Sequence, residues 1–191
     1  MILCGFIVYR LCNGNARNAM QSMVNNNITR NIYSDEWYTD QKTVDFGLEL
    51  LQPKRGGWIM CPFDSSKSLY VQTLLAKGFN VIYGITDFLE NDLYEFDYLI
   101  TNPPFSVKDQ VIEQVYKYGK PSLLLLPLDS LGGVKRASLY AKYGYPFVTI
   151  PTRRVAYYDE KETLRKGAAF HSIYSQFNVG KSGIQWEQFN G

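Results

Sequence analysis

The chain has 191 residues, of which 46% are hydrophobic, and its 20 Lys and Arg against 18 Asp and Glu give a net charge of +2. This size and composition predict one folded domain with a substantial core. No apolar run reaches the roughly 18 residues that a transmembrane helix needs, so no membrane partner is expected. The near-neutral charge excludes a uniformly basic surface, and any basic surface must be local.

Three cysteines, Cys4, Cys12 and Cys61, are present, and their spacing does not resemble that of metal ligands. An odd, scattered set predicts a reducing cytoplasm, no disulfide framework and no metal site. The apolar stretch at residues 1–9 has no basic residue before it, which argues against a secretory signal.

Residues 1–33 form a polar, Asn-rich lead-in without a clear period. We expect this lead-in to be partly disordered or loosely packed, and residues 34–191 to form the domain. Within residues 34–52, Val44, Leu48 and Leu51 have the spacing of one helix face, and that helix should end before Pro53.

Strand-like and helix-like segments alternate from residue 57 onward. Strands are predicted at residues 58–61, 81–85, 98–101, 122–126, 147–150 and 168–177. Helices are predicted at about 68–77, around 111–116 up to Gly119, and at 135–143. This alternation predicts an α/β fold with a doubly wound, mostly parallel sheet of the Rossmann-like type in a single domain.

Ligands of such sheets bind in the crevice at the carboxyl ends of the strands. The first of these strands is followed by Cys61, Pro62, Phe63, Asp64 and Ser65. Ser65 and Ser66 are candidate N-caps, and the free N–H groups of a helix start favour a carboxylate. Asp64 would suit a cationic group of the same ligand. The alternative is that the serine is a purely structural cap.

Asp87 and Phe88 follow the next strand. Asp87 could accept a hydrogen bond from an amine on a ligand ring, while Phe88 packs on that ring. The alternative is that Asp87 is simply a turn residue.

The tetrapeptide Asn102-Pro103-Pro104-Phe105 directly follows the apolar segment at residues 98–101. Each proline fixes φ near −65° and removes an N–H, which makes the loop stiff and rich in acceptors. The Asn102 side-chain oxygen and the Pro103 carbonyl could accept both N–H groups of a planar amine, which would localise the nitrogen lone pair for attack. Phe105 would offer a face for stacking a base. An ordinary proline-rich turn is the alternative.

Four segments in this order resemble the small DNA N6-adenine methyltransferases of phages and prophages, which are class I S-adenosylmethionine-dependent enzymes. They are residues 35–39 (Asp-Glu-Trp-Tyr-Thr), residues 61–64 (Cys-Pro-Phe-Asp), Asp87-Phe88 and the Asn-Pro-Pro-Phe loop. The resemblance covers residues 34–177. It implies S-adenosylmethionine as cofactor and methyl transfer to N6 of adenine in DNA.

The resemblance also implies roles for particular residues. Trp37, Tyr38 and Thr39 would close the cofactor site, and the loop after the first strand, with Asp87, Phe88 and Asn102, would complete it. Asn102, Pro103, Pro104 and Phe105 would carry catalysis.

Basic and aromatic residues near the C-terminus predict a nucleic-acid contact, and the resemblance implies that the nucleic acid is DNA. This set comprises Arg153, Arg154, Tyr157, Lys161, Arg165 and Lys166. The alternative is a solvated loop between two edge strands. His171 lies in an apolar stretch and is predicted to be packed or hydrogen-bonded.

Two other functions remain open. The same loop would serve a methyltransferase acting on RNA adenine or on a protein glutamine amide. A methyltransferase-like binding module without catalysis is the third reading, since Ser65, Ser66 and Lys67 stand where glycines would let a cofactor approach the backbone.

Overall fold

The computed structural model describes residues 38–91, 93–158 and 171–188, which lie in one compact unit, Asp35–Gly191. The predicted lead-in, residues 1–33, lies outside the described residues. A seven-stranded sheet with the order β3-β2-β4-β5-β8-β6-β9 forms the centre of the fold. Its strands are β2 (Trp58–Cys61), β3 (Asn80–Tyr83), β4 (Tyr98–Thr101), β5 (Ser122–Pro127), β6 (Phe147–Pro151), β8 (Ser172–Phe177) and β9 (Gly183–Glu187).

Every neighbouring pair in this sheet is parallel except the two pairs that involve β8. The antiparallel β8 lies between β5 and β6, and all the other strands point the same way. Their carboxyl ends therefore meet at one edge of the sheet. This mostly parallel, helix-covered architecture confirms the predicted fold class.

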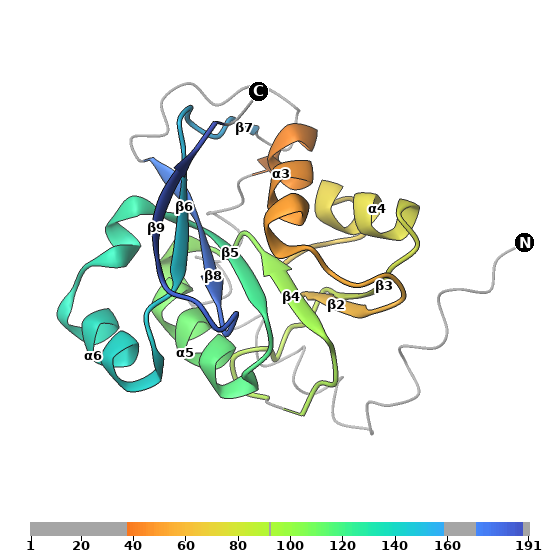
Figure 1. Ribbon diagram of the computed structural model, residues 1–191. Coiled ribbons are helices and arrows are strands. Elements are labelled where there is room, and N and C mark those ends of the chain that lie inside the picture. Colours follow the sequence, from red (N-terminus) through yellow and green to blue (C-terminus); the bar gives the residue numbers. More distant parts are fainter. Residues whose placement is uncertain (1–37, 92, 159–170, 189–191) are drawn as a thin grey trace, which may run out of the picture. The chain divides into compact units, whose positions relative to one another are not determined.

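Helices cover both faces of the sheet (Figure 1). They are α3 (Gln41–Leu51), α4 (Leu69–Ala76), α5 (Lys108–Tyr118) and α6 (Val134–Tyr143). Successive side chains of a strand point to opposite faces, and β8 shows both sides. The Tyr174 hydroxyl donates to the Thr43 carbonyl of α3 at 3.0 Å. The Phe177 ring meets Tyr116 of α5 edge-on, with centroids 5.3 Å apart.

The central strand β5 is buried along its whole length, including the run Leu123–Leu126. Leu123 and Leu125 join the core cluster that contains Val44 of α3 and Tyr70 of α4. Since Leu124 and Leu126 are equally buried, both faces of the strand are covered. This explains why its sequence is continuously apolar rather than alternating.

Helix ends follow local chemistry. The Asp40 side chain caps α3 by accepting from the Thr43 N–H at 2.8 Å. Gly119 ends α5 with φ of 63°, a left-handed conformation that glycine adopts without a Cβ penalty. The helix-stop signals read from the sequence at Pro53 and Gly119 therefore match the helices observed.

Three strands were not predicted from the sequence. One is the edge strand β9, which pairs in parallel with β6. The other two, β1 (Tyr38–Thr39) and β7 (Tyr157–Tyr158), are two residues long and form a separate antiparallel pair. None of the helices in the described ranges has the length and apolar content that crossing a membrane requires.

Candidate active site

The loops predicted to bind ligand begin at neighbouring strand ends. Cys61 of β2 is aligned with Tyr83 of β3, and β4 lies on the other side of β2. The Ile85 N–H donates to the Pro62 carbonyl at 2.8 Å, which ties the first two loops together. The structure therefore brings the predicted cofactor loops and the Asn-Pro-Pro-Phe loop to one edge of the sheet, where α/β folds bind ligands.

The loop after β4 is anchored by its prolines. Pro103 and Pro104 are buried, whereas Asn102 and Phe105 are half-buried at the loop's two ends. The Val107 N–H donates to the Pro104 carbonyl at 3.1 Å, and the chain turns directly into α5. The Asn102 Oδ1 atom is shielded from solvent. The loop is therefore fixed by its prolines, and Asn102 is half-buried at the strand end with its side-chain oxygen turned away from solvent.

Asp64 is the most perturbed acid of this edge. Its Oδ1 accepts from the Ser68 hydroxyl at 2.5 Å. Its Oδ2 is buried and accepts no hydrogen bond from the described residues. Burial raises the pKa of Asp64 from 3.8 to about 7, while the Ser68 hydrogen bond acts in the opposite direction. Asp64 is half-buried, and an oxygen without a hydrogen-bond partner among the described residues could pair with a cationic ligand group that reaches it.

Ser68, rather than Ser65 or Ser66, is the N-cap of α4. Its hydroxyl accepts from the Tyr70 N–H at 3.2 Å while donating to Asp64. Ser65 and Ser66 belong to the preceding turn, where the Ser65 carbonyl accepts from the Ser68 N–H at 3.0 Å. The predicted caps were wrong because this turn delays the helix start. Ser65 itself remains exposed beside Asp64 in the chain.

A glycine occurs at the end of β3 instead of in the loop after β2. Gly84 has φ of 68°, a conformation that favours glycine. A Cβ at this position would lie 3.8 Å from the Asp64 carbonyl oxygen. The backbones of the two loops therefore approach each other closely at Asp64.

Phe88 is part of an aromatic cluster next to this edge and is only 1% exposed. Its ring stacks on Tyr118 at 5.8 Å and meets the edge of Phe63 at 5.5 Å. Phe63, half-buried, is the more exposed of these two phenylalanines. A flat ligand at this edge would meet Phe63 before Phe88.

Asp87 organises its own loop. Its carboxylate accepts from the Tyr94 hydroxyl at 2.6 Å and from the Asn91 amide at 3.2 Å. Cys61 is buried, and burial, followed by the charge of Asp64, raises the pKa of its thiol. Asp87 therefore holds its own loop in place, and Cys61 is a buried residue at the end of β2.

The β1–β7 pair joins two segments that were predicted to act on different ligands. Thr39 is aligned with Tyr157, and both residues are buried. The Tyr157 hydroxyl lies 2.6 Å from the Ser172 hydroxyl. Its ring is therefore not available for stacking on a base in this conformation. Trp37, Lys161, Arg165 and Lys166 lie outside the described residues, as does the side chain of Tyr38.

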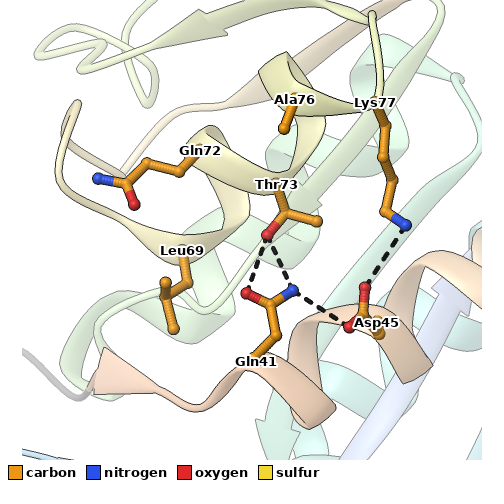
Figure 2. Close-up of a pocket in the computed structure, with 7 residues that line it drawn as sticks. All are labelled: Gln41, Asp45, Leu69, Gln72, Thr73, Ala76 and Lys77. Atoms are coloured by element: carbon orange, nitrogen blue, oxygen red, sulfur yellow. Dashed lines mark hydrogen bonds and ion pairs between the residues drawn. The ribbon is translucent and has the colours of Figure 1, made fainter.

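An open pocket lies at the seam between α3 and α4 (Figure 2). Gln41 of α3 donates to the Thr73 hydroxyl of α4 at 3.0 Å, and Lys77 pairs with Asp45 at 3.6 Å. These side chains connect the two helices. In the described ranges, no group of three or more His, Cys, Asp or Glu could hold a metal ion.

Arg136 links the helix after the Asn-Pro-Pro-Phe loop to the segment after β5, a role that was not predicted from the sequence. Its Nη1 lies 2.6 Å from Asp109 Oδ1 in the first turn of α5. Its Nη2 donates to the Asp129 carbonyl at 3.1 Å and its Nε to the Gly132 carbonyl at 2.6 Å.

His171 lies with Nε2 3.0 Å from the Pro151 carbonyl, in line with the hydrogen-bonded role expected for it.

Replacing Arg136 with methionine should destabilise the fold by about 2 kcal/mol, because charge-assisted hydrogen bonds of this kind contribute about 1.5–3 kcal/mol. Urea denaturation would measure the change. Lys117→Met is the matched control: it removes an exposed pair with Glu113, whose expected contribution is about 0.3–0.5 kcal/mol. Equal effects of the two substitutions would contradict the linking role of Arg136.

Comparison with solved structures identifies the fold. The chain is similar to a protein from Vibrio vulnificus YJ016 assigned as the modification subunit of a type I restriction enzyme, with a TM-score of 0.52 and 13% identity. The alignment covers 91% of this chain and 50% of the other, so the chain spans about half the length of that protein. The chain shares the fold of that protein, a Rossmann-like α/β fold with a mostly parallel sheet.

Weaker similarities were found to two other proteins. One is a Pyrococcus horikoshii protein assigned as an RNA methyltransferase, with a TM-score of 0.46, 10% identity and coverage of 81% of this chain and 89% of that one. The other is a precorrin-6y C5,15-methyltransferase from Geobacter metallireducens GS-15, with a TM-score of 0.44, 15% identity and coverage of 73% and 89%. No protein-family model and no curated protein matches the sequence.

Proposed function

We propose that this chain transfers a methyl group from S-adenosylmethionine to the N6 amine of adenine in DNA. The observation that carries the proposal is the rigid amide of Asn102, held at the end of β4 by two buried prolines. It shares its sheet edge with Asp64, whose buried Oδ2 has no hydrogen-bond partner among the described residues.

Residues at the ends of β2 and β3 fit the cofactor. The unpaired Oδ2 of Asp64 suits the ammonium group of its amino-acid part, and the half-buried Phe63 ring suits a flat group such as adenine. Thr39 and Cys61 border the same edge, together with Pro62, Ser65, Asp87 and Phe88. When bound, S-adenosylmethionine supplies an electrophilic methyl group.

The Asn-Pro-Pro-Phe loop supplies the substrate contacts. On binding, the Asn102 side chain must turn its oxygen, shielded from solvent here, toward the substrate. This oxygen and the Pro103 carbonyl then accept the two N–H groups of the adenine amine. Accepting both makes the nitrogen pyramidal and localises its lone pair. Phe105 stacks on the base, and Pro104 fixes the turn. A paired adenine must first leave the duplex stack to reach this loop.

DNA is favoured as substrate by two observations. Arg153 and Arg154 are exposed directly after β6, at the same edge of the sheet as Asn102. The similar Vibrio protein is assigned to a restriction enzyme. An RNA adenine or a glutamine amide presents the same planar NH₂ group, so both remain candidate substrates. The serines and lysine after Asp64, in place of glycines, favour the non-catalytic binding module instead.

Two measurements test the proposal. Calorimetric titration with S-adenosylmethionine should give saturable binding, whereas no heat at millimolar ligand would support the binding module. Labelled methyl transfer should then be compared on DNA, RNA and protein side by side. Transfer to RNA or protein but not to DNA would overturn the substrate while leaving the methyltransferase reaction intact.

A further inference from the structure

An exposed tryptophan lies on the edge strand β9, at the margin of the sheet. Trp186 is 70% exposed, and Ile184, two residues before it on the same face, is 62% exposed. Trp186 is aligned with Ile150 of β6, and Glu187 with Pro151. The tryptophan is therefore fixed on a hydrogen-bonded strand and presents most of its surface to solvent.

Two arginines follow β6 beside the end of β9. The Thr152 N–H donates to the Glu187 carbonyl at 3.0 Å, which joins the chain after β6 to this strand. Arg153 and Arg154 come next and are exposed. We call Trp186, Arg153 and Arg154 the β9 tip. Because β6 and β9 run parallel to β4 and β5, the β9 tip lies at the sheet edge that carries Asn102.

We propose that the β9 tip binds the nucleic-acid strand that flanks the target base, with Trp186 stacking on an unpaired base and the arginines contacting phosphates. The inference rests on the proposed function for its substrate class. An exposed aromatic ring on a strand whose end is hydrogen-bonded to the segment carrying two exposed arginines matches the alternation of bases and phosphates in a single strand. A purely apolar patch would instead match a second copy of the chain.

The order of the strands gives the distance between the β9 tip and the Asn102 loop. Four strand spacings separate β4 from β9, which at about 4.8 Å each gives about 19 Å. A stacked strand rises about 3.4 Å per nucleotide, so the β9 tip should meet bases up to about six nucleotides from the target. Oligonucleotides cut off closer to the target on that side should lose the contact.

Fluorescence and binding of variants test the proposal. An oligonucleotide that extends well beyond this reach on both sides of a central adenine is titrated into the full chain. Trp186→Ala should weaken binding about tenfold and remove most of the tryptophan quenching. Trp58→Ala is the matched control. Trp58 is 46% exposed but is the first residue of β2, at the amino ends of the parallel strands and opposite the end that carries Asn102. It should bind as the wild type does.

Charge variants give effects of opposite sign. Arg153→Gln should weaken binding and lower the slope of log affinity against log salt by about one per lost phosphate contact. Glu187→Gln should tighten binding, because Glu187 is exposed at the end of β9 and its carboxylate, which accepts from the Gln185 amide at 3.2 Å, would repel phosphates. If this strand had only a structural role, the two substitutions would not change the affinity in opposite directions.

The outcomes separate the inference from the proposed function. If the wild type methylates DNA and Trp186→Ala binds it equally well, the β9 tip assignment falls and the enzymatic function stands. If methyl transfer is absent but binding is lost with Trp186→Ala, the inference stands alone. A wild type that binds no oligonucleotide, or a Trp186→Ala variant that changes only the sedimentation of the free chain, overturns the inference.

Discussion

Replacing Asn102 with alanine is expected to abolish methyl transfer, with a fall in kcat of roughly a thousandfold. The substitution removes the side-chain acceptor that polarises the amine, and losing one preorganised polar group of an active site costs about 10²–10³ in kcat. The affinity for S-adenosylmethionine, measured by calorimetry, should remain close to that of the wild type, because Asp64 and Phe63 are unchanged.

Asn80→Ala is the matched control for this experiment. Asn80 is exposed at the amino end of β3, where its side chain donates to the Gly56 carbonyl at 3.0 Å. That position lies at the opposite edge of the sheet, so the variant should keep its activity. An Asn102→Ala protein that retains most of its turnover on an adenine-containing oligonucleotide would show that the assignment of Asn102 is wrong.

Asp64→Asn is expected to make the folded chain more stable and to weaken cofactor binding. The pKa shift of Asp64 from 3.8 to about 7 corresponds to roughly 4 kcal/mol of unfavourable ionisation in the folded chain. The neutral amide avoids this cost, so above pH 7 the variant should be more stable by about 1–3 kcal/mol in urea denaturation. Its cofactor affinity should fall at least tenfold, because the ammonium group loses its carboxylate partner.

The stability that Asp64 contributes to the folded chain should fall as the pH rises. Between pH 3.8 and about 7 the folded chain keeps a proton on Asp64 that the unfolded chain has released. The stability contributed by this group is therefore full below 3.8 and is lost as the pH rises through about 7. Cofactor affinity changes the other way, since only the ionised carboxylate pairs with the ammonium group.

Asp97→Asn serves as the control. Asp97 is exposed, and its Oδ2 accepts from the Trp58 N–H at 2.8 Å, a bond that an asparagine oxygen can keep. The variant should show the wild-type pH profile for stability and for cofactor binding. A flat profile in the wild type would contradict the ionisation assigned to Asp64.

Local signals explain what was predicted well. The strand Tyr98–Thr101 and the proline loop after it are defined by neighbouring residues, as is the end of α5 at Gly119. Their positions depend on backbone preferences of a few residues. Ligands of α/β sheets bind at the carboxyl ends of the strands, so the candidate site could be predicted there without knowing which strands pair with which.

Long-range pairing explains what was missed. The position of β8 between β5 and β6, and the addition of β9 at the edge, depend on partners far away in the sequence. Arg136 meets Asp109 across 27 residues, and no local pattern signals such a pair. The Ser68 cap could have been found from its spacing to Asp64, since a serine four residues after an aspartate at a helix start can bond to it.

The six aligned residue pairs between β5 and β8 have a consequence for how the chain folds. Until residues 172–177 have been synthesised, one backbone edge of the most apolar strand has no partner, and its four consecutive leucines are prone to self-association. Closing this pair spans about fifty residues, which predicts slow folding with a late docking step. Truncation after β7 should therefore give an aggregating product, however well the earlier strands and helices form.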